Sequence, residues 1–165
     1  MTKLLLSLHV LAAVLAIGPV TAAASMFPKA LRRAHSDPGG GEALTTLRTL
    51  HRICRVYAAI GLAVPVFGFA TAGSLGVLGS PWLITSIILT AAAAALLALR
   101  ILPTQDAALT DAQASGSGLG SDSGPATGSG PAAAARLAML TGVFNLLWAT
   151  VTVLMIIRPG STTGA

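Results

Sequence analysis

The sequence lacks most of the groups on which enzymes rely. Charged residues make up only 9% of the 165 positions, against roughly 25% in soluble globular proteins. It contains no nucleophile elbow, Walker loop, CxxC or HExxH motif, and no acidic residue lies within a long apolar run. Carboxylate acid/base chemistry and a carboxylate proton relay inside a membrane are therefore unsupported. These absences favour a protein without enzymatic activity over an enzyme.

The single cysteine and the excess of basic over acidic residues exclude fewer classes of protein than the missing motifs do. The single cysteine, Cys54, rules out an intrachain disulfide. A formal charge of +5 would point to nucleic acid if the chain were soluble. Basic residues beside apolar runs more often record the orientation of a membrane protein, so we expect no nucleic-acid partner.

Long apolar runs are what the sequence does have. Four of them, at about 4–27, 53–73, 82–102 and 137–157, occupy about half of the chain. Each has the roughly 20 residues with which a helix crosses about 30 Å of hydrocarbon. We therefore predict an all-α, polytopic membrane protein, one domain over residues 1–165, whose four transmembrane helices form an antiparallel bundle. Heavy use of alanine and glycine indicates a GC-rich bacterial genome.

The first run could be a cleaved signal peptide or a retained helix. Lys3, an apolar core, Pro19 and the small residues around Ala24 fit a signal peptide with a processing site. Cleavage would, however, send a basic loop across the membrane, with Lys29, Arg32, Arg33, Arg48, Arg52 and Arg55. The run is also about 24 residues long, beyond the roughly 7 to 15 of a signal core. We predict a retained helix.

The distribution of Lys and Arg predicts the orientation. If both termini lie outside, the loops after the first and third helices are cytoplasmic and hold eight of the ten basic residues, leaving only Lys3 and Arg158 outside. This arrangement satisfies the positive-inside rule. We therefore predict a multi-pass protein of the bacterial cytoplasmic membrane, with its N-terminus and C-terminus outside.

The two predicted cytoplasmic connectors differ in composition. Residues 28–52 are basic and include an amphipathic helix, which starts near Glu42 and continues without interruption into the second span. Its basic face carries Arg48, Arg52 and Arg55, which can bind anionic lipid headgroups of the bilayer. Residues 104–131 are rich in Gly and Ser and predict a flexible linker.

His9 is the only ionisable side chain well inside the predicted hydrocarbon region, roughly 7 Å below the outer end of its helix. A hydrogen bond to a hydroxyl on a neighbouring helix would make it structural. An intramembrane histidine is also a candidate metal ligand, haem ligand or proton carrier. Met155 reaches a comparable depth, so an axial His/Met pair for haem b or copper is the alternative to our leading expectation of no cofactor.

The fourth run carries a polar stripe. Spacings of 4, 3, 4 and 3 place five residues on one helix face, namely Thr141, Asn145, Trp148, Thr152 and Met155. Asn145 lies near mid-membrane and must find a hydrogen-bond partner, so the stripe should face the other helices. Interhelical packing is favoured over substrate contact.

Three further residues are potential metal ligands. His51 and Cys54 are i, i+3 neighbours, but two ligands are too few for a metal site. His35 lies in a loop that the sequence does not place. A helix on the membrane surface is the favoured interpretation of this region.

The first helix, SLHVLAAVLAIGPVTAAASMFP, has an early histidine, a mid-helix Gly-Pro and a basic loop after it. In this it resembles an uncharacterised family of small four-helix integral membrane proteins common in actinobacteria. A more distant similarity is to the four-helix membrane protoporphyrinogen oxidases and copper-resistance-D-type proteins, which open with a histidine-bearing helix and can bind haem or copper. Only His9 carries over. The lysine that the oxidases use in their third helix has no counterpart here, which argues against oxidase activity.

These observations leave three functions to compare. The leading expectation is a non-enzymatic membrane protein that packs against itself or against another membrane protein through small-residue helix faces. The second is a membrane redox protein that binds haem or copper through His9. Small-solute transport is third, because the spans lack charged groups.

Overall fold

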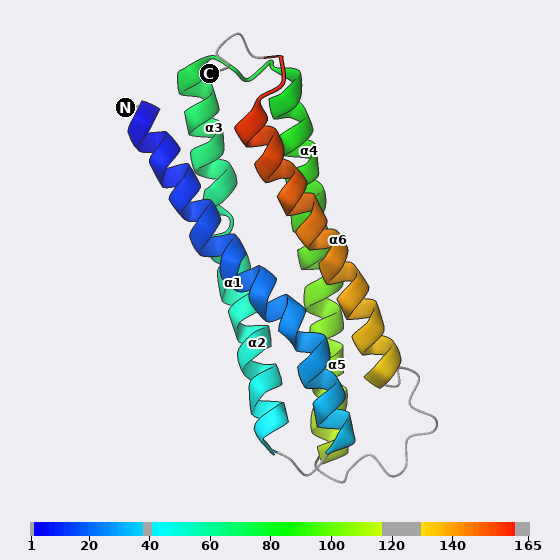
Figure 1. Cartoon of the computed structure of the whole chain (residues 1–165). Coiled ribbons are helices and arrows are strands. Elements are labelled where there is room, and N and C mark those ends of the chain that lie inside the picture. The colour runs from blue at the N-terminus through cyan, green and yellow to red at the C-terminus, as the bar shows by residue number, and fades with distance from the viewer. Residues whose placement is uncertain (1, 38–40, 117–129, 161–165) are drawn as a thin grey trace.

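The computed structural model describes residues 2–37, 41–116 and 130–160, which are helical apart from short turns (Figure 1). The first rod is α1 (Thr2–Ser36), and the second combines α2 (Gly41–Ile60) with α3 (Ala63–Leu75). The third rod combines α4 (Pro81–Leu96), a π-helical turn η1 (Leu97–Ile101) and α5 (Leu102–Gly116), and the fourth is α6 (Gly130–Ile157).

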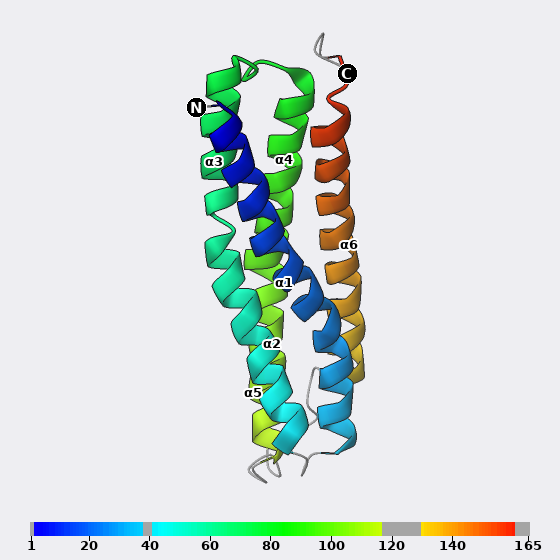
Figure 2. The same cartoon turned by 60° about the vertical axis from the view of Figure 1, so that its left-hand side comes forward.

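Successive rods run in opposite directions (Figures 1 and 2). The start of α1, the turn from α3 to α4 and the end of α6 lie at one end of the bundle, which we call the terminal end (Figures 1 and 2). The end of α1 and the starts of α2 and α6 lie with the end of α5 at the other, which we call the basic end. The predicted all-α antiparallel four-helix fold is confirmed.

Each rod is long and apolar enough to cross a membrane, over Thr2–Ser36, Gly41–Leu75, Pro81–Gly116 and Pro131–Ile157. In the most apolar stretch of the first rod only 11% of the residues are buried within the chain. Most of its apolar side chains therefore face outward, as expected for a helix surrounded by lipid. The chain is a multi-pass membrane protein. A rod of 35 residues is about 52 Å long against roughly 30 Å of hydrocarbon, so the bundle projects beyond the bilayer.

At the basic end the first helix is longer than predicted, which shortens the predicted connector at 28–52. Residues 28–36 are helical rather than a loop, and Pro28 is buried inside α1 instead of ending it. Packing explains this outcome, because Phe27 and Leu31 are both completely buried in the core and hold the helix together across the proline. Residues 41–52 form the predicted amphipathic helix, and residues 38–40 lie outside the described residues.

The predicted flexible linker at 104–131 is also too long. Residues 104–116 continue as helix α5, and α6 starts at Gly130 instead of near residue 137. The reason is burial, since Gln105, Ala108 and Ala112 pack into the core. The remaining part of the predicted linker, residues 117–129, lies outside the described residues.

The third rod passes Pro103 by means of the π-helical turn η1. Pro103 has no N–H to donate and its ring crowds the carbonyl four residues before it. In η1 the Leu102 N–H bonds to the Leu97 carbonyl, five residues back, which widens the helix just before the proline. The rod therefore continues beyond residue 102, where the predicted third span ends.

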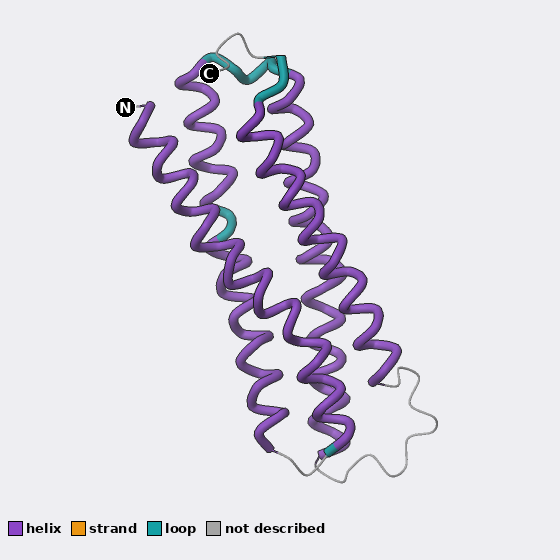
Figure 3. The backbone as a smooth tube through the Cα atoms, viewed as in Figure 1, coloured by secondary structure: helices purple, strands orange, loops and turns teal. Residues whose placement is uncertain are grey.

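Helix α2 continues without interruption into the second span, as predicted, and the second rod breaks only within that span, at Gly61 and Leu62 (Figure 3). Leu62 N–H bonds to the Ala59 carbonyl and Val64 N–H to the Gly61 carbonyl, both three residues back. Pro65 supplies the cause, because it cannot donate to the Gly61 carbonyl that a regular helix would assign to it.

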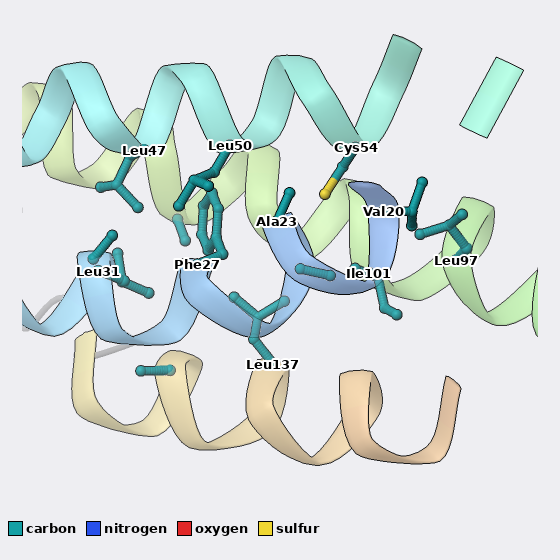
Figure 4. Packing of buried hydrophobic residues seen from close by; sticks show 14 of the residues in the cluster. Val20, Ala23, Phe27, Leu31, Leu47, Leu50, Cys54, Leu97, Ile101 and Leu137 are labelled. Atoms are coloured by element: carbon teal, nitrogen blue, oxygen red, sulfur yellow. The ribbon is translucent and has the colours of Figure 1, made fainter. Parts of the chain in front are cut away.

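Packing is uneven along the bundle. The main core joins α1, α2, η1, α5 and α6, with Phe27, Leu47, Cys54 and Leu137 fully buried in it (Figure 4). Toward the terminal end α1 packs on α3 and α4 on α6, while α3 and α4 barely meet. A small cluster of Ala72, Trp82 and Leu83 closes the tip.

Candidate functional site

A buried polar network joins α2 to α5 inside the main core. The His51 Nδ1 lies 3.3 Å from the Gln105 Oε1, and the Gln105 Nε2 donates to the Cys54 Sγ at 3.7 Å. The His51 Nε2 lies 3.5 Å from Asp106 Oδ1, an ion pair when the imidazole is protonated. His51, Cys54 and Gln105 are all buried, whereas the Asp106 carboxylate is exposed.

Sequence reasoning found half of this network. His51 and Cys54 were recognised as neighbours, but Gln105 and Asp106 fall in the segment predicted to be a linker. The spacing of Gln105, Ala108 and Ala112 was the available signal of a buried helix face. In the described residues no group of three or more His, Cys, Asp and Glu side chains could hold a metal ion. His35 bonds through Nδ1 to the Leu31 carbonyl of its own helix.

The predicted lipid-binding arginines separate into two groups. Arg48 turns toward α5, where the Gln113 carbonyl oxygen, with the amide oriented to suit, accepts from Arg48 Nε at 3.0 Å. Arg52 and Arg55 instead line an open hollow of about 390 Å³ on α2, together with His51, Val56 and Ala59.

His9 faces α3. Its Nδ1 lies 2.9 Å from the Val64 carbonyl, and its ring lies so close to Gly68 that a Cβ there would be 2.9 Å from the His9 Cε1. The partner is therefore a backbone carbonyl and not the hydroxyl expected for a structural role. Because a carbonyl can only accept, Nδ1 carries the proton and Nε2 is left as an acceptor.

Met155 contacts a different part of the terminal end. It packs against the tip cluster of Ala72, Trp82 and Leu83, whereas His9 contacts Val64 and Gly68. The two residues are thus placed against different neighbours. These contacts give the predicted axial His/Met pair no support.

The polar stripe of α6 faces inward at three of its positions and leaves polar atoms without partners. Thr141 Oγ1, Asn145 Oδ1 and Trp148 Nε1 are buried and unbonded within the described part of the chain. The Asn145 Nδ2 donates to the Ser25 Oγ of α1 at 3.3 Å. Thr152 is exposed and bonds to the Trp148 carbonyl of its own helix. Ser25 is the partner that sequence reasoning missed.

No protein-family model, curated protein or solved structure matches this chain. The resemblance of the first helix to the actinobacterial family, and the more distant one to haem- and copper-binding proteins, therefore stay predictions. Four features of the structure bear on function: the core network, the hollow on α2, the His9 contact and the stripe on α6.

Proposed function

We propose that this chain is a non-enzymatic protein of the bacterial cytoplasmic membrane that acts by lateral helix packing, in a homo-oligomer or with another membrane protein. The observation that carries the proposal is the Asn145 side chain on α6. Its Oδ1 has no hydrogen-bond partner among the described residues, and in hydrocarbon an unbonded polar group costs free energy that association can recover.

Asn145 lies where an incoming helix can reach it. Its amide bonds to Ser25, an exposed residue of α1, so the pair lies at the surface seam between α1 and α6. Rotation about the Cβ–Cγ bond of Asn145 (χ2) would exchange the places of Oδ1 and Nδ2 and turn Oδ1 outward. Asn145 is thus the member of the stripe that can exchange an internal contact for one with a partner.

Small residues flank this seam. Ala22 of α1 and Gly142 and Ala149 of α6 are exposed, and a Cβ on Gly142 would meet nothing within 4 Å. Small side chains allow two helix backbones to approach closely, which is how membrane helices associate when lipid offers no hydrophobic driving force. With the basic end in the cytoplasm, as the charge distribution favours, both termini lie outside.

Cysteine cross-linking in native membranes tests this proposal. In a Cys54→Ala background, Gly142→Cys should cross-link efficiently, and adding Asn145→Leu should reduce the yield several-fold. Val143→Cys is the matched control, because it lies at the same depth but about 100° around the helix. A chain that stays monomeric after mild extraction, with no copurifying partner and no cross-link at Gly142→Cys, would contradict the proposal.

Cofactor binding by His9 is the second candidate, because one observation favours it. The bond from Nδ1 to the Val64 carbonyl fixes the tautomer and leaves Nε2 as the ligating atom, the usual arrangement of metal-bound histidines. The test is the absorption spectrum and metal content of the purified protein. A Soret band or stoichiometric copper should vanish in His9→Ala and persist in His35→Ala, and a clean spectrum of the unaltered protein removes this candidate.

A further inference from the structure

The side chains that line the hollow on α2 change from polar to apolar along the helix axis. His51, Arg52 and Arg55 line one part of it, and Val56 and Ala59 line the part toward α3. His51 and Arg52 precede the second apolar run at about 53–73, and Arg55, Val56 and Ala59 lie in its first two turns. The hollow therefore lies at the boundary between headgroup region and hydrocarbon, with Arg52 and Arg55 nearer the polar side and Ala59 farthest toward the hydrocarbon.

The two arginines of the hollow carry uncompensated charge. In the described residues the one ion pair joins His51 to Asp106 of α5, and neither Arg52 nor Arg55 takes part in it. Both side chains are exposed. At an i, i+3 spacing their Cβ atoms lie about 5 to 6 Å apart, so both guanidinium groups can reach one anion.

We propose that this hollow is a binding site for an anionic phospholipid, with the phosphodiester between Arg52 and Arg55 and the start of an acyl chain along Val56 and Ala59. Guanidinium groups bind phosphate oxygens with two parallel hydrogen bonds, and a basic pocket at a membrane helix is the setting in which acidic lipids are recognised. A volume of about 390 Å³ accommodates a headgroup.

The apolar half of the hollow selects a lipid over free phosphate. Val56 and Ala59 face hydrocarbon beside the two arginines, so a lipid whose phosphate lies between the arginines can place its own acyl chain along them, whereas a soluble anion makes no contact with them. Asp106 lies nearby with its carboxylate exposed, but it faces the imidazole of His51. Within the described residues the Asp106 carboxylate forms no ion pair with either arginine, which leaves the two arginines as the anion-binding groups.

Native mass spectrometry of the full chain in detergent, titrated with phosphatidylglycerol or phosphatidylcholine, tests the site. The double variant Arg52→Gln/Arg55→Gln should bind phosphatidylglycerol about 30-fold more weakly. The control Arg32→Gln/Arg33→Gln removes the same charge from exposed positions of α1 at the same end, and should change the affinity less than threefold. Equal losses in the two double variants, or equal binding of both lipids, would overturn the proposal.

A second variant and a soluble competitor identify the source of the phosphate. Ala59→Phe fills the apolar part of the hollow and should weaken phosphatidylglycerol binding without touching the arginines. Glycerol phosphate at millimolar concentration should displace little lipid. Complete displacement by glycerol phosphate, or unchanged lipid binding in Ala59→Phe, would overturn the lipid assignment in favour of a soluble phosphate. Because every altered residue is exposed, the fold should survive each substitution.

Discussion

The helices pack differently at the two ends of the bundle. At the basic end four rods converge on one core, whose large side chains, such as Phe27 and Leu31, are completely buried. At the terminal end the helices pack as two pairs, α1 with α3 and α4 with α6, joined mainly at the tip. The basic end therefore holds the bundle together, and the terminal end leaves most of its apolar surface to lipid.

The largest expected difference in the free energy of unfolding is between alanine substitutions of two phenylalanines, one at each end. Phe27→Ala at the basic end should lower the free energy of unfolding by about 3 to 5 kcal/mol, because it opens a cavity in a closely packed core. Phe69→Ala on α3 should cost less than about 1 kcal/mol, because Phe69 is 51% exposed and faces outward. Equilibrium unfolding in mixed detergent micelles measures both. Equal losses would show that the two ends are equally well packed.

The core network should give the next largest effect. Gln105→Ala removes the partner of His51 and Cys54 from a fully buried position and should cost about 2 to 3 kcal/mol. Gln105→Met keeps the volume and should cost less, so the difference between the two variants measures the cavity separately from the hydrogen bonds. Identical stabilities of the two variants in the same unfolding assay would contradict this division.

A smaller effect is expected at the α1–α3 contact of the terminal end. Gly68→Ala would place a Cβ 2.9 Å from the His9 ring and should cost about 1 to 2 kcal/mol. In a His9→Ala background the same change should be nearly neutral. Gly73→Ala is the control, since a Cβ there would meet nothing within 4 Å. Additive effects of Gly68→Ala and His9→Ala in a double-mutant cycle would show that the two residues do not interact.

The smallest effect concerns the unpartnered hydroxyl of Thr141. Thr141→Val should be neutral or stabilise the protein by about 1 kcal/mol, because the hydroxyl is buried without a hydrogen bond. Thr71→Val is the matched comparison, since Thr71 is also buried but its hydroxyl donates to the Phe67 carbonyl, and it should be mildly destabilising. A clear loss of stability in Thr141→Val would reveal a partner for the hydroxyl.

Hydrophobic run length predicted the fold well. Four runs of about 20 residues gave four rods, and the inward direction of Thr141, Asn145 and Trp148 followed from a 3.6-residue period. The residues at which the helices end could not be predicted from the apolar runs. The predicted first and third runs end at about residues 27 and 102, just before Pro28 and Pro103. Local propensity says nothing of the neighbours that bury Leu31 or Gln105 and hold a helix together across a proline.

The sites were predicted less completely than the fold. The sequence marked His9, Asn145 and the arginines as unusual, since polar groups in or beside an apolar run are rare. It did not indicate their partners, because Val64 contributes a backbone carbonyl and Ser25 looks like any small residue. Partners that depend on the relative rotation of two helices require the three-dimensional packing.

The π-helical turn η1 gives the third rod its one position where chain length can change without disturbing either side. Buried residues fall at every fourth position from Ala93 through Leu97 and Ile101 to Gln105, which in a regular helix would drift by about 120° around the axis. The extra residue of η1 absorbs about 100° of that drift. Deleting one residue of η1 together with Pro103→Ala should therefore leave both flanking faces in register. The same deletion in α4 would rotate every later side chain of the rod, so relatives of this protein should tolerate a one-residue gap here and nowhere else along the rod.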